Sequence, residues 1–159
     1  METTLFVMCG IPGSGKSTFC KTKYPEIKHI SRDEIRFSML KDGEDYFSHE
    51  KEVTQKFWDL INEELAAGHS VFADQTSLNS RSRTWLLTHT LPDVRKVAVV
   101  MDIPFKVCAE RNRGRHGKER VPEAALRNMA NSFTCPVPME GFDQIILVRE
   151  NGEMVVIAE

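Results

Sequence analysis

The sequence has few features of secreted, membrane or metal-binding proteins. Its four cysteines are scattered over 159 residues without a C-x-x-C pair, so neither a disulfide framework nor a cysteine zinc site is expected. The five histidines also lack the spacing of metal ligands. No secretory signal, apolar run of membrane-spanning length, repeat or low-complexity stretch is visible. We therefore expect a reduced, cytoplasmic protein without membrane association.

The chain also lacks a large excess of charge of one sign. It has 21 basic and 23 acidic residues, a formal net charge of −2. This balance excludes a global basic field of the kind that coats long nucleic acids. The length suits one domain, residues 1–159, with its own core. No pattern in the sequence indicates a protein partner.

The most informative segment is residues 10–17, which read G-I-P-G-S-G-K-S. They fit the phosphate-binding loop pattern G-x-x-x-x-G-K-[ST] in full, between an apolar run at 5–9 and a potential helix at 16–23. Glycines let consecutive N–H groups face one concavity, and the helix N-terminus adds partial positive charge there. In this motif Lys16 reaches the β- and γ-phosphates and the Ser17 hydroxyl ligates Mg²⁺.

Strand and helix patterns alternate along the whole chain. Strands are expected at 5–9, 27–30, 70–73 and 96–101, and the intervening helices at 16–23, 33–40, 48–67 and 80–90. Three residues are suitable helix N-caps: Ser31, Asn79 and Asp102. Asp102 would cap a helix at 104–114, and Pro122 suits the first position of another helix. Residues 143–149 and 154–158 flank Asn151-Gly152 as in a hairpin. The prediction is an α/β fold of three layers, the P-loop kinase fold, with a parallel sheet flanked by helices and a C-terminal hairpin.

Three classes of protein use such a phosphate cradle: kinases, NTP-driven motors or switches, and nucleotide binders without turnover. Motors usually place a water-activating carboxylate beside the magnesium-binding Asp, whereas here Asp74 is followed by the amide of Gln75. No N-K-x-D segment for reading a guanine base occurs. Both absences favour transfer of a phosphoryl group to a hydroxyl over hydrolysis.

A candidate catalytic base follows the second expected strand. Ligands of open α/β sheets bind beyond the carboxyl ends of the strands, so Asp33 should face the γ-phosphate. A carboxylate there can accept the proton of an incoming hydroxyl. Arg36 lies on the same helical face, and its guanidinium suits a phosphate beside that hydroxyl. The alternative is a helix N-terminus with a surface ion pair.

Residues 111–120 carry five cations and two glycines between two expected helices. A flexible basic lid of this kind can close over the donor phosphates and oppose the charge that develops on the transferred group. The alternative is a solvated charge run. Arg81 and Arg83 pose a similar choice between contact with nucleic-acid phosphates and exposed helix charge.

These motifs resemble those of the polynucleotide 5′-hydroxyl kinase family, in its phage and animal members, over nearly the whole chain. The resemblance includes Phe133-x-x-Pro136 and Glu140-Gly141-Phe142, similar to the C-terminal segment of the animal kinases. It implies Asp33 as base, Arg32 and Arg36 as acceptor-binding residues, and Arg115 as the donor-phosphate arginine that joins Lys16 in catalysis. The implied ATP-binding residues are Gly10, Pro12, Gly13, Ser14, Gly15, Lys16, Ser17, Thr18, Arg111 and Arg115.

One segment departs from the family pattern. After the third strand the family reads D-x-T-N or D-T-N, with an Asp that contacts the acceptor end, whereas Ser77 stands here where Asn is usual. The acceptor-binding position falls on Asp74 in one version and on Gln75 in the other. The resemblance predicts an ATP- and Mg²⁺-dependent kinase acting on the 5′-hydroxyl end of DNA or RNA. A small-molecule kinase acting on a nucleoside, sugar or antibiotic, and a non-catalytic nucleotide-binding protein, remain the alternatives.

Overall fold

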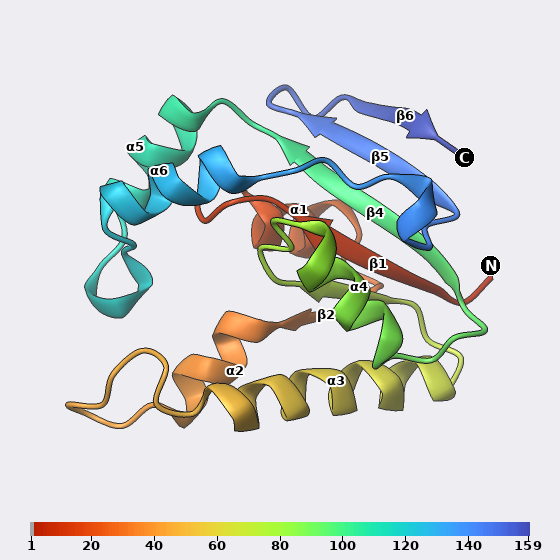
Figure 1. Cartoon of the computed structure of the whole chain (residues 1–159), viewed down its shortest axis with the longest axis horizontal. Helices are drawn as coiled ribbons and strands as arrows, with labels where there is room; N and C mark the ends of the chain where they lie inside the picture. The colour runs from red at the N-terminus through yellow and green to blue at the C-terminus, as the bar shows by residue number, and fades with distance from the viewer. Residues whose placement is uncertain (1) are drawn as a thin grey trace.

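The computed structural model describes residues 2–159, and strands alternate with helices through most of this range (Figure 1). The strands are β1 (Thr4–Cys9), β2 (Lys28–Ser31), β3 (Val71–Asp74), β4 (Arg95–Asp102), β5 (Gln144–Arg149) and β6 (Met154–Ala158). The helices are α1 (Lys16–Lys23), α2 (Arg32–Met39), α3 (Glu50–Ala66), α4 (Ser80–Thr88), α5 (Phe105–Arg113) and α6 (Glu123–Ser132), with short 3₁₀ turns at Gly117–Glu119 and Pro138–Glu140.

The strands form one six-stranded sheet in the order β2-β3-β1-β4-β5-β6. All neighbouring pairs are parallel except β5 and β6, which form the expected antiparallel hairpin. Parallel strands place their carboxyl ends at one edge of the sheet, and the segments that follow β1, β2 and β3 therefore meet there. The predicted α/β fold with a C-terminal hairpin is confirmed.

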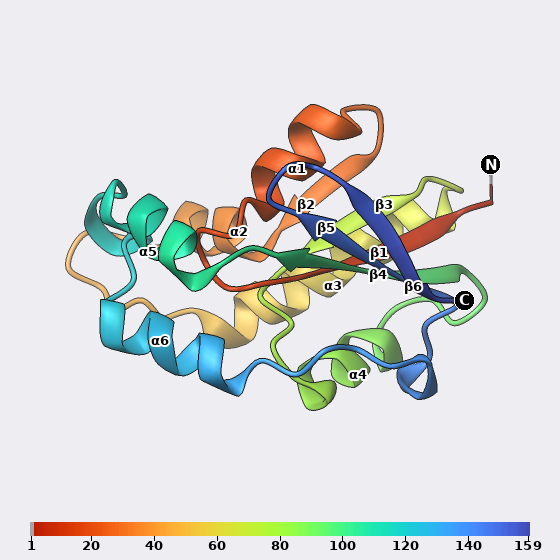
Figure 2. The same cartoon turned by 90° about the horizontal axis from the view of Figure 1, so that it is seen from above.

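Helices cover both faces of the sheet (Figure 2). On one face, α1 contributes Phe19 and Cys20 to a cluster built on β-strand residues such as Phe72 and Val99. On the other face, α3 and α4 pack against the sheet through Phe57, Ile61, Leu65, Leu86 and Leu87. A third, smaller cluster joins α5 and α6 to Ile11, so the phosphate-binding loop rests on a packed helix pair.

Side-chain caps mark the start of two helices, α2 and α4. The Ser31 side chain accepts a hydrogen bond from the Glu34 N–H, and Asn79 accepts one from Ser82, as expected of N-caps. The Asp102 cap is wrong, because β4 continues through Asp102 and α5 begins only at Phe105, after the extended Pro104. Pro122 precedes the first turn of α6 as its N-cap residue rather than lying inside it.

Within residues 2–159, no helix is both long enough and apolar enough to cross a membrane.

Candidate active site

The loop between β1 and α1 curls around the Lys16 side chain. The Lys16 ammonium donates to the carbonyl oxygens of Gly10, at 2.9 Å, and Ile11, at 3.3 Å. Gly13 and Gly15 have φ of +86° and +89°, which only glycine adopts without strain. Burial lowers the pKa of Lys16, although the carboxylates of Asp74 and Asp33 oppose this. The loop therefore holds a cation at the N-terminus of α1, where anionic oxygens bind well.

Gly13→Ala is expected to destabilise the protein by about 1–3 kcal/mol more than Gly68→Ala. The two glycines share the same strain, with φ of +86° and +84°. A Cβ at Gly13 would lie 2.5 Å from the Cys108 carbonyl oxygen, whereas one at Gly68 would meet nothing within 4 Å. Urea unfolding of both variants measures the difference. Equal losses would mean that α5 shifts away from the loop without cost.

The end of β3 supplies a carboxylate beside the loop. Ser17 Oγ donates to Asp74 Oδ2 at 2.6 Å, and His29 Nε2 lies 2.8 Å from the same oxygen. Burial raises the pKa of Asp74, but the His29 and Ser17 hydrogen bonds and the Lys16 charge outweigh it and hold that pKa below its usual value. Hydroxyl and carboxylate oxygens suit Mg²⁺, so Ser17 and Asp74 fit a magnesium site. Asp74 also lines the cavity that Asp33 lines, so its role in acceptor binding stays a prediction.

A cavity of about 650 Å³ opens between the phosphate-binding loop and α2. Asp33, Lys16 and Ser17 line this one cavity, together with Asp74, Gln75 and Ser77 from the segment after β3. Its outer wall is formed by residues 115–122 and by the loop between α2 and α3. Lys118 donates to the carbonyl oxygen of Glu44, so these two walls touch. Asp33 thus lines the same open cavity as the phosphate-binding loop.

A second cavity, of about 520 Å³, lies on the other side of the loop. It is bounded by α1, by Met101 and Ile103 at the end of β4, and by the β5–β6 turn. Arg115 borders both cavities, whereas Arg111 borders only this one. The Arg111 guanidinium also donates to the Gly13 carbonyl oxygen at 3.2 Å. Of the two lid arginines expected to bind the donor, Arg111 therefore contacts the phosphate-binding loop and Arg115 lines the cavities beside it.

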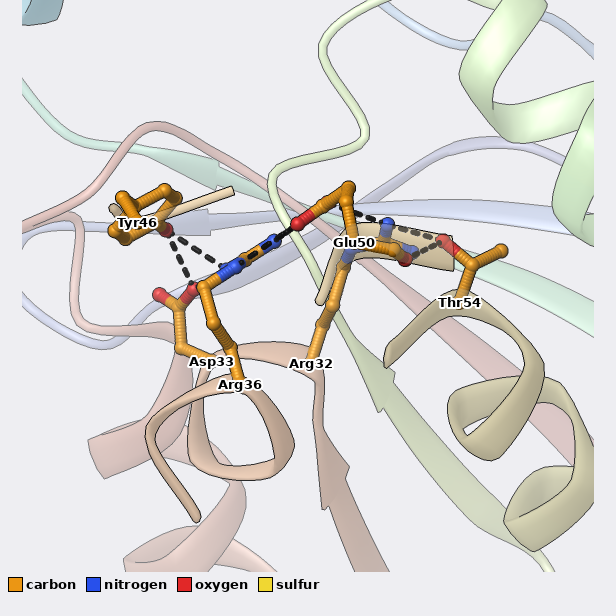
Figure 3. Close-up of polar contacts among 6 residues, drawn as sticks. All are labelled: Arg32, Asp33, Arg36, Tyr46, Glu50 and Thr54. Carbon is orange, nitrogen blue, oxygen red and sulfur yellow. Dashed lines mark hydrogen bonds and ion pairs between the residues drawn. The ribbon is translucent and has the colours of Figure 1, made fainter. Parts of the chain in front are cut away.

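Arg32, Asp33 and Arg36 belong to one polar network with residues that sequence reasoning missed (Figure 3). Glu50, at the start of α3, accepts from Arg32 at 2.7 Å and from Arg36 at 2.7 and 3.0 Å. The Tyr46 hydroxyl donates to Asp33 Oδ1 at 3.0 Å. Burial of the Tyr46 hydroxyl and the nearby Asp33 charge raise its pKa to about 12. Tyr46 lies between the helices expected at 33–40 and 48–67, and no local pattern links it or Glu50 to Asp33.

His29 is a further missed residue. No sequence pattern links His29 to the candidate site, because its hydrogen-bond partner Asp74 is 45 residues away in the sequence. The pairing of β2 with β3 aligns Ser31 with Asp74, which brings the two strand ends together. His29 can therefore be assigned to the site only when the pairing of β2 with β3 is known.

Both interpretations of Arg83 are wrong. Its side chain is fully buried, so it neither lies exposed on α4 nor reaches a nucleic-acid phosphate. It donates to both carboxylate oxygens of Glu140, at 2.7 and 3.0 Å, and to the carbonyl oxygens of Ser77 and Thr134. Arg83 therefore ties the segment after β3 to the C-terminal segment.

Comparison with known proteins identifies relatives of this fold. A family model described as an AAA domain matches residues 5–136. The chain is 28% identical over 153 residues to transcription factor bHLH140 of Arabidopsis thaliana. This alignment covers 93% of this chain and 16% of that protein. It is 26% identical over 137 residues to L-seryl-tRNA(Sec) kinase of Methanococcus maripaludis. This second alignment covers 83% of this chain and 53% of that protein. The chain thus spans about half or less of these curated relatives.

Solved structures of several kinases share the architecture. A chain of the Pnkp1/Rnl/Hen1 RNA repair complex aligns with a TM-score of 0.69 at 23% identity, covering 82% of this chain and 44% of that one. A sugar kinase from Janibacter sp. aligns at 0.66 and 17% identity, covering 94% and 86%. A fungal RNA kinase aligns at 0.64 and 17% identity, covering 93% and 38%. At these identities the likeness shows the fold, which is that of a P-loop kinase. Because the family match spans most of the chain and includes the phosphate-binding loop, the chain belongs to the AAA domain family.

Proposed function

We propose that this protein is a kinase that transfers the γ-phosphate of ATP to the 5′-hydroxyl end of DNA or RNA. The observation that carries the proposal is the position of Asp33, whose carboxylate lines the same cavity as Lys16 and Ser17. Its side chain is 55% exposed, so an acceptor can reach it. The family, the phosphate-binding loop and the kinases among the similar structures support a phosphotransferase.

The proposed donor site uses both cavities. The triphosphate lies along the loop, with Lys16 and the α1 N-terminus on its oxygens, and the nucleoside occupies the cavity beside α1. Gly10, Pro12, Gly13, Ser14 and Gly15 shape the cradle, and Thr18 lines both cavities. Mg²⁺, held by Ser17 with Asp74 beside it, neutralises charge on the phosphates when bound. Arg115 opposes the charge that develops on the transferred group, with Arg111 fixing the lid segment against Gly13.

The proposed reaction is a direct displacement. The acceptor hydroxyl oxygen forms a bond to the γ-phosphorus, while the bond from that phosphorus to the β–γ bridging oxygen breaks. The hydroxyl proton passes to the Asp33 carboxylate, which acts as general base. ADP and a 5′-phosphorylated end are the products. The polynucleotide acceptor rests on the resemblance of the Asp33 segment to polynucleotide kinases and on similar RNA kinase structures.

A small-molecule kinase is the second candidate. One similar structure that favours it is the Janibacter sugar kinase, because the alignment covers 94% of this chain and 86% of that one. Both candidates use the same loop, base and lid, and they differ only in what occupies the cavity beside Asp33.

Incubation with γ-labelled ATP, Mg²⁺ and a 5′-hydroxyl oligonucleotide separates these functions. We expect label on the oligonucleotide and none on a matched oligonucleotide that already carries a 5′-phosphate. Label found only on nucleosides or sugars supplied in parallel would support the small-molecule kinase. Tight ATP binding without transfer to any hydroxyl would support a nucleotide-binding protein without turnover.

A further inference from the structure

All three nitrogens of the Arg36 guanidinium contact protein groups in this structure. Nε and one terminal nitrogen contact the Glu50 carboxylate, and the other terminal nitrogen contacts the Asp33 carboxylate and the Tyr46 hydroxyl. The residue is only 4% exposed, and its guanidinium carbon also lies 4.3 Å from the centroid of the Tyr46 ring. An acceptor phosphate at Arg36 would therefore compete with Glu50, Asp33 and Tyr46 for this guanidinium.

Glu50 holds the Arg36 guanidinium in this network. It holds Arg36 by a two-pronged contact of Nε and a terminal nitrogen, which is the strong geometry for a guanidinium and a carboxylate. The same carboxylate also accepts from Arg32. With Asp33, the network contains two cations and two anions, so it has no net charge to attract a phosphate.

The two oxygens of the Asp33 carboxylate differ in the same network (Figure 3). Oδ1 accepts from Arg36 and from the Tyr46 hydroxyl. Oδ2 has no hydrogen-bond partner among residues 2–159. Two donors on one oxygen fix the rotation of the carboxylate and leave the other oxygen available to a hydroxyl in the cavity.

We infer that Arg36 is a positioning residue that orients the Asp33 carboxylate with the help of Glu50 and Tyr46. On this inference, Arg36 does not bind the acceptor phosphate. This inference rests on the proposed function, because it concerns the acceptor side of that reaction. It replaces the role in phosphate binding that the sequence resemblance implies for Arg36. Removal of Arg36 then slows the chemical step for every acceptor, whether or not a phosphate lies beside its hydroxyl.

The test uses two 5′-hydroxyl oligonucleotides that differ only at the first internucleotide linkage. One has a phosphodiester there, and the other has a neutral methylphosphonate, while all other phosphates are kept. We expect Arg36→Gln to lower kcat about 100-fold on both, with KM for each oligonucleotide within about threefold of wild type. A loss at least about tenfold larger on the phosphodiester would overturn the inference, because it would mean that Arg36 contacts that phosphate.

Tyr46→Phe provides a second test that keeps the fold, since it removes one hydroxyl only. We expect kcat to fall about tenfold on both oligonucleotides, the effect of losing a hydrogen bond to a charged group. Tyr24→Phe is the matched control, because the Tyr24 hydroxyl contacts Met154 Sδ at 3.6 Å and does not line the acceptor cavity. Equal activity of the two variants would also overturn the inference. If wild type phosphorylates neither oligonucleotide, the proposed function fails, and the inference fails with it.

Discussion

Asp33→Asn is expected to lower the rate of phosphoryl transfer about 10²–10⁴-fold, the usual contribution of a general base. Asparagine has the same shape, and its carbonyl oxygen can still accept from Arg36 and Tyr46, so the network around it persists. Its amide cannot accept the proton of the acceptor hydroxyl. Initial rates with γ-labelled ATP and a 5′-hydroxyl oligonucleotide measure the loss.

ATP binding should remain nearly unchanged in this variant, because Lys16 and the α1 N-terminus do not depend on Asp33 for their geometry. Titration calorimetry with ATP and Mg²⁺ checks this directly. Asp45→Asn is the matched control, because Asp45 is exposed in the loop between α2 and α3 and does not line the cavity. If Asp33→Asn transfers phosphate as fast as the Asp45→Asn protein, Asp33 is not the base.

Arg83→Met is expected to destabilise the protein by about 3–5 kcal/mol, the cost of breaking a buried ion pair from one side. The change leaves the Glu140 carboxylate, whose side chain is 6% exposed, without its cation. It also removes the donor that the carbonyl oxygens of Ser77 and Thr134 share. Ser77 is the one non-glycine residue with positive φ in the described chain, at +49°, so this donor also helps to hold a strained turn that lines the acceptor cavity.

Urea unfolding of three variants tests the role of Arg83. The double variant Arg83→Met with Glu140→Met should recover much of the stability, since replacing both partners by apolar groups removes the uncompensated charge. Arg81→Met should be close to wild type, because Arg81 is exposed on the same helix. A loss below about 1 kcal/mol for Arg83→Met, the range of exposed ion pairs, would contradict the structural role of the pair.

Sequence patterns predicted the fold in most of its parts because its elements follow local rules. Apolar residues spaced three or four apart predict one buried face for α3, made of Val53, Phe57, Leu60, Ile61 and Leu65. The structure buries all of them except Leu60, which is partly buried. Ser31 and Asn79 cap their helices because a side-chain oxygen next to the first turn satisfies a backbone N–H nearby. Asp102 failed as a cap because strand pairing with Arg149 extends β4 through it, and pairing with a distant strand overrides a local preference.

The candidate site was predictable to the extent that its parts are contiguous. The phosphate-binding loop is one such part, and the structure gives it the expected positive φ at Gly13 and Gly15. Asp33 was singled out because it follows a strand, and parallel strands end at one edge of the sheet. Tyr46 and Glu50 were not, because their contacts with Asp33 and Arg36 join α2 to a loop and to the next helix.

The sequence by itself determined the α/β architecture, the anion-binding loop and the position of a carboxylate across from it. These features depend on spacing within short segments, where backbone geometry links residue type to conformation. Only the tertiary structure decided which partners the arginines have. Arg36 and Arg83 look alike in sequence as basic residues on helices, yet each is buried against a glutamate from another segment. A buried charge takes its role from the partner that offsets its desolvation, and that partner is set by packing rather than by sequence neighbours.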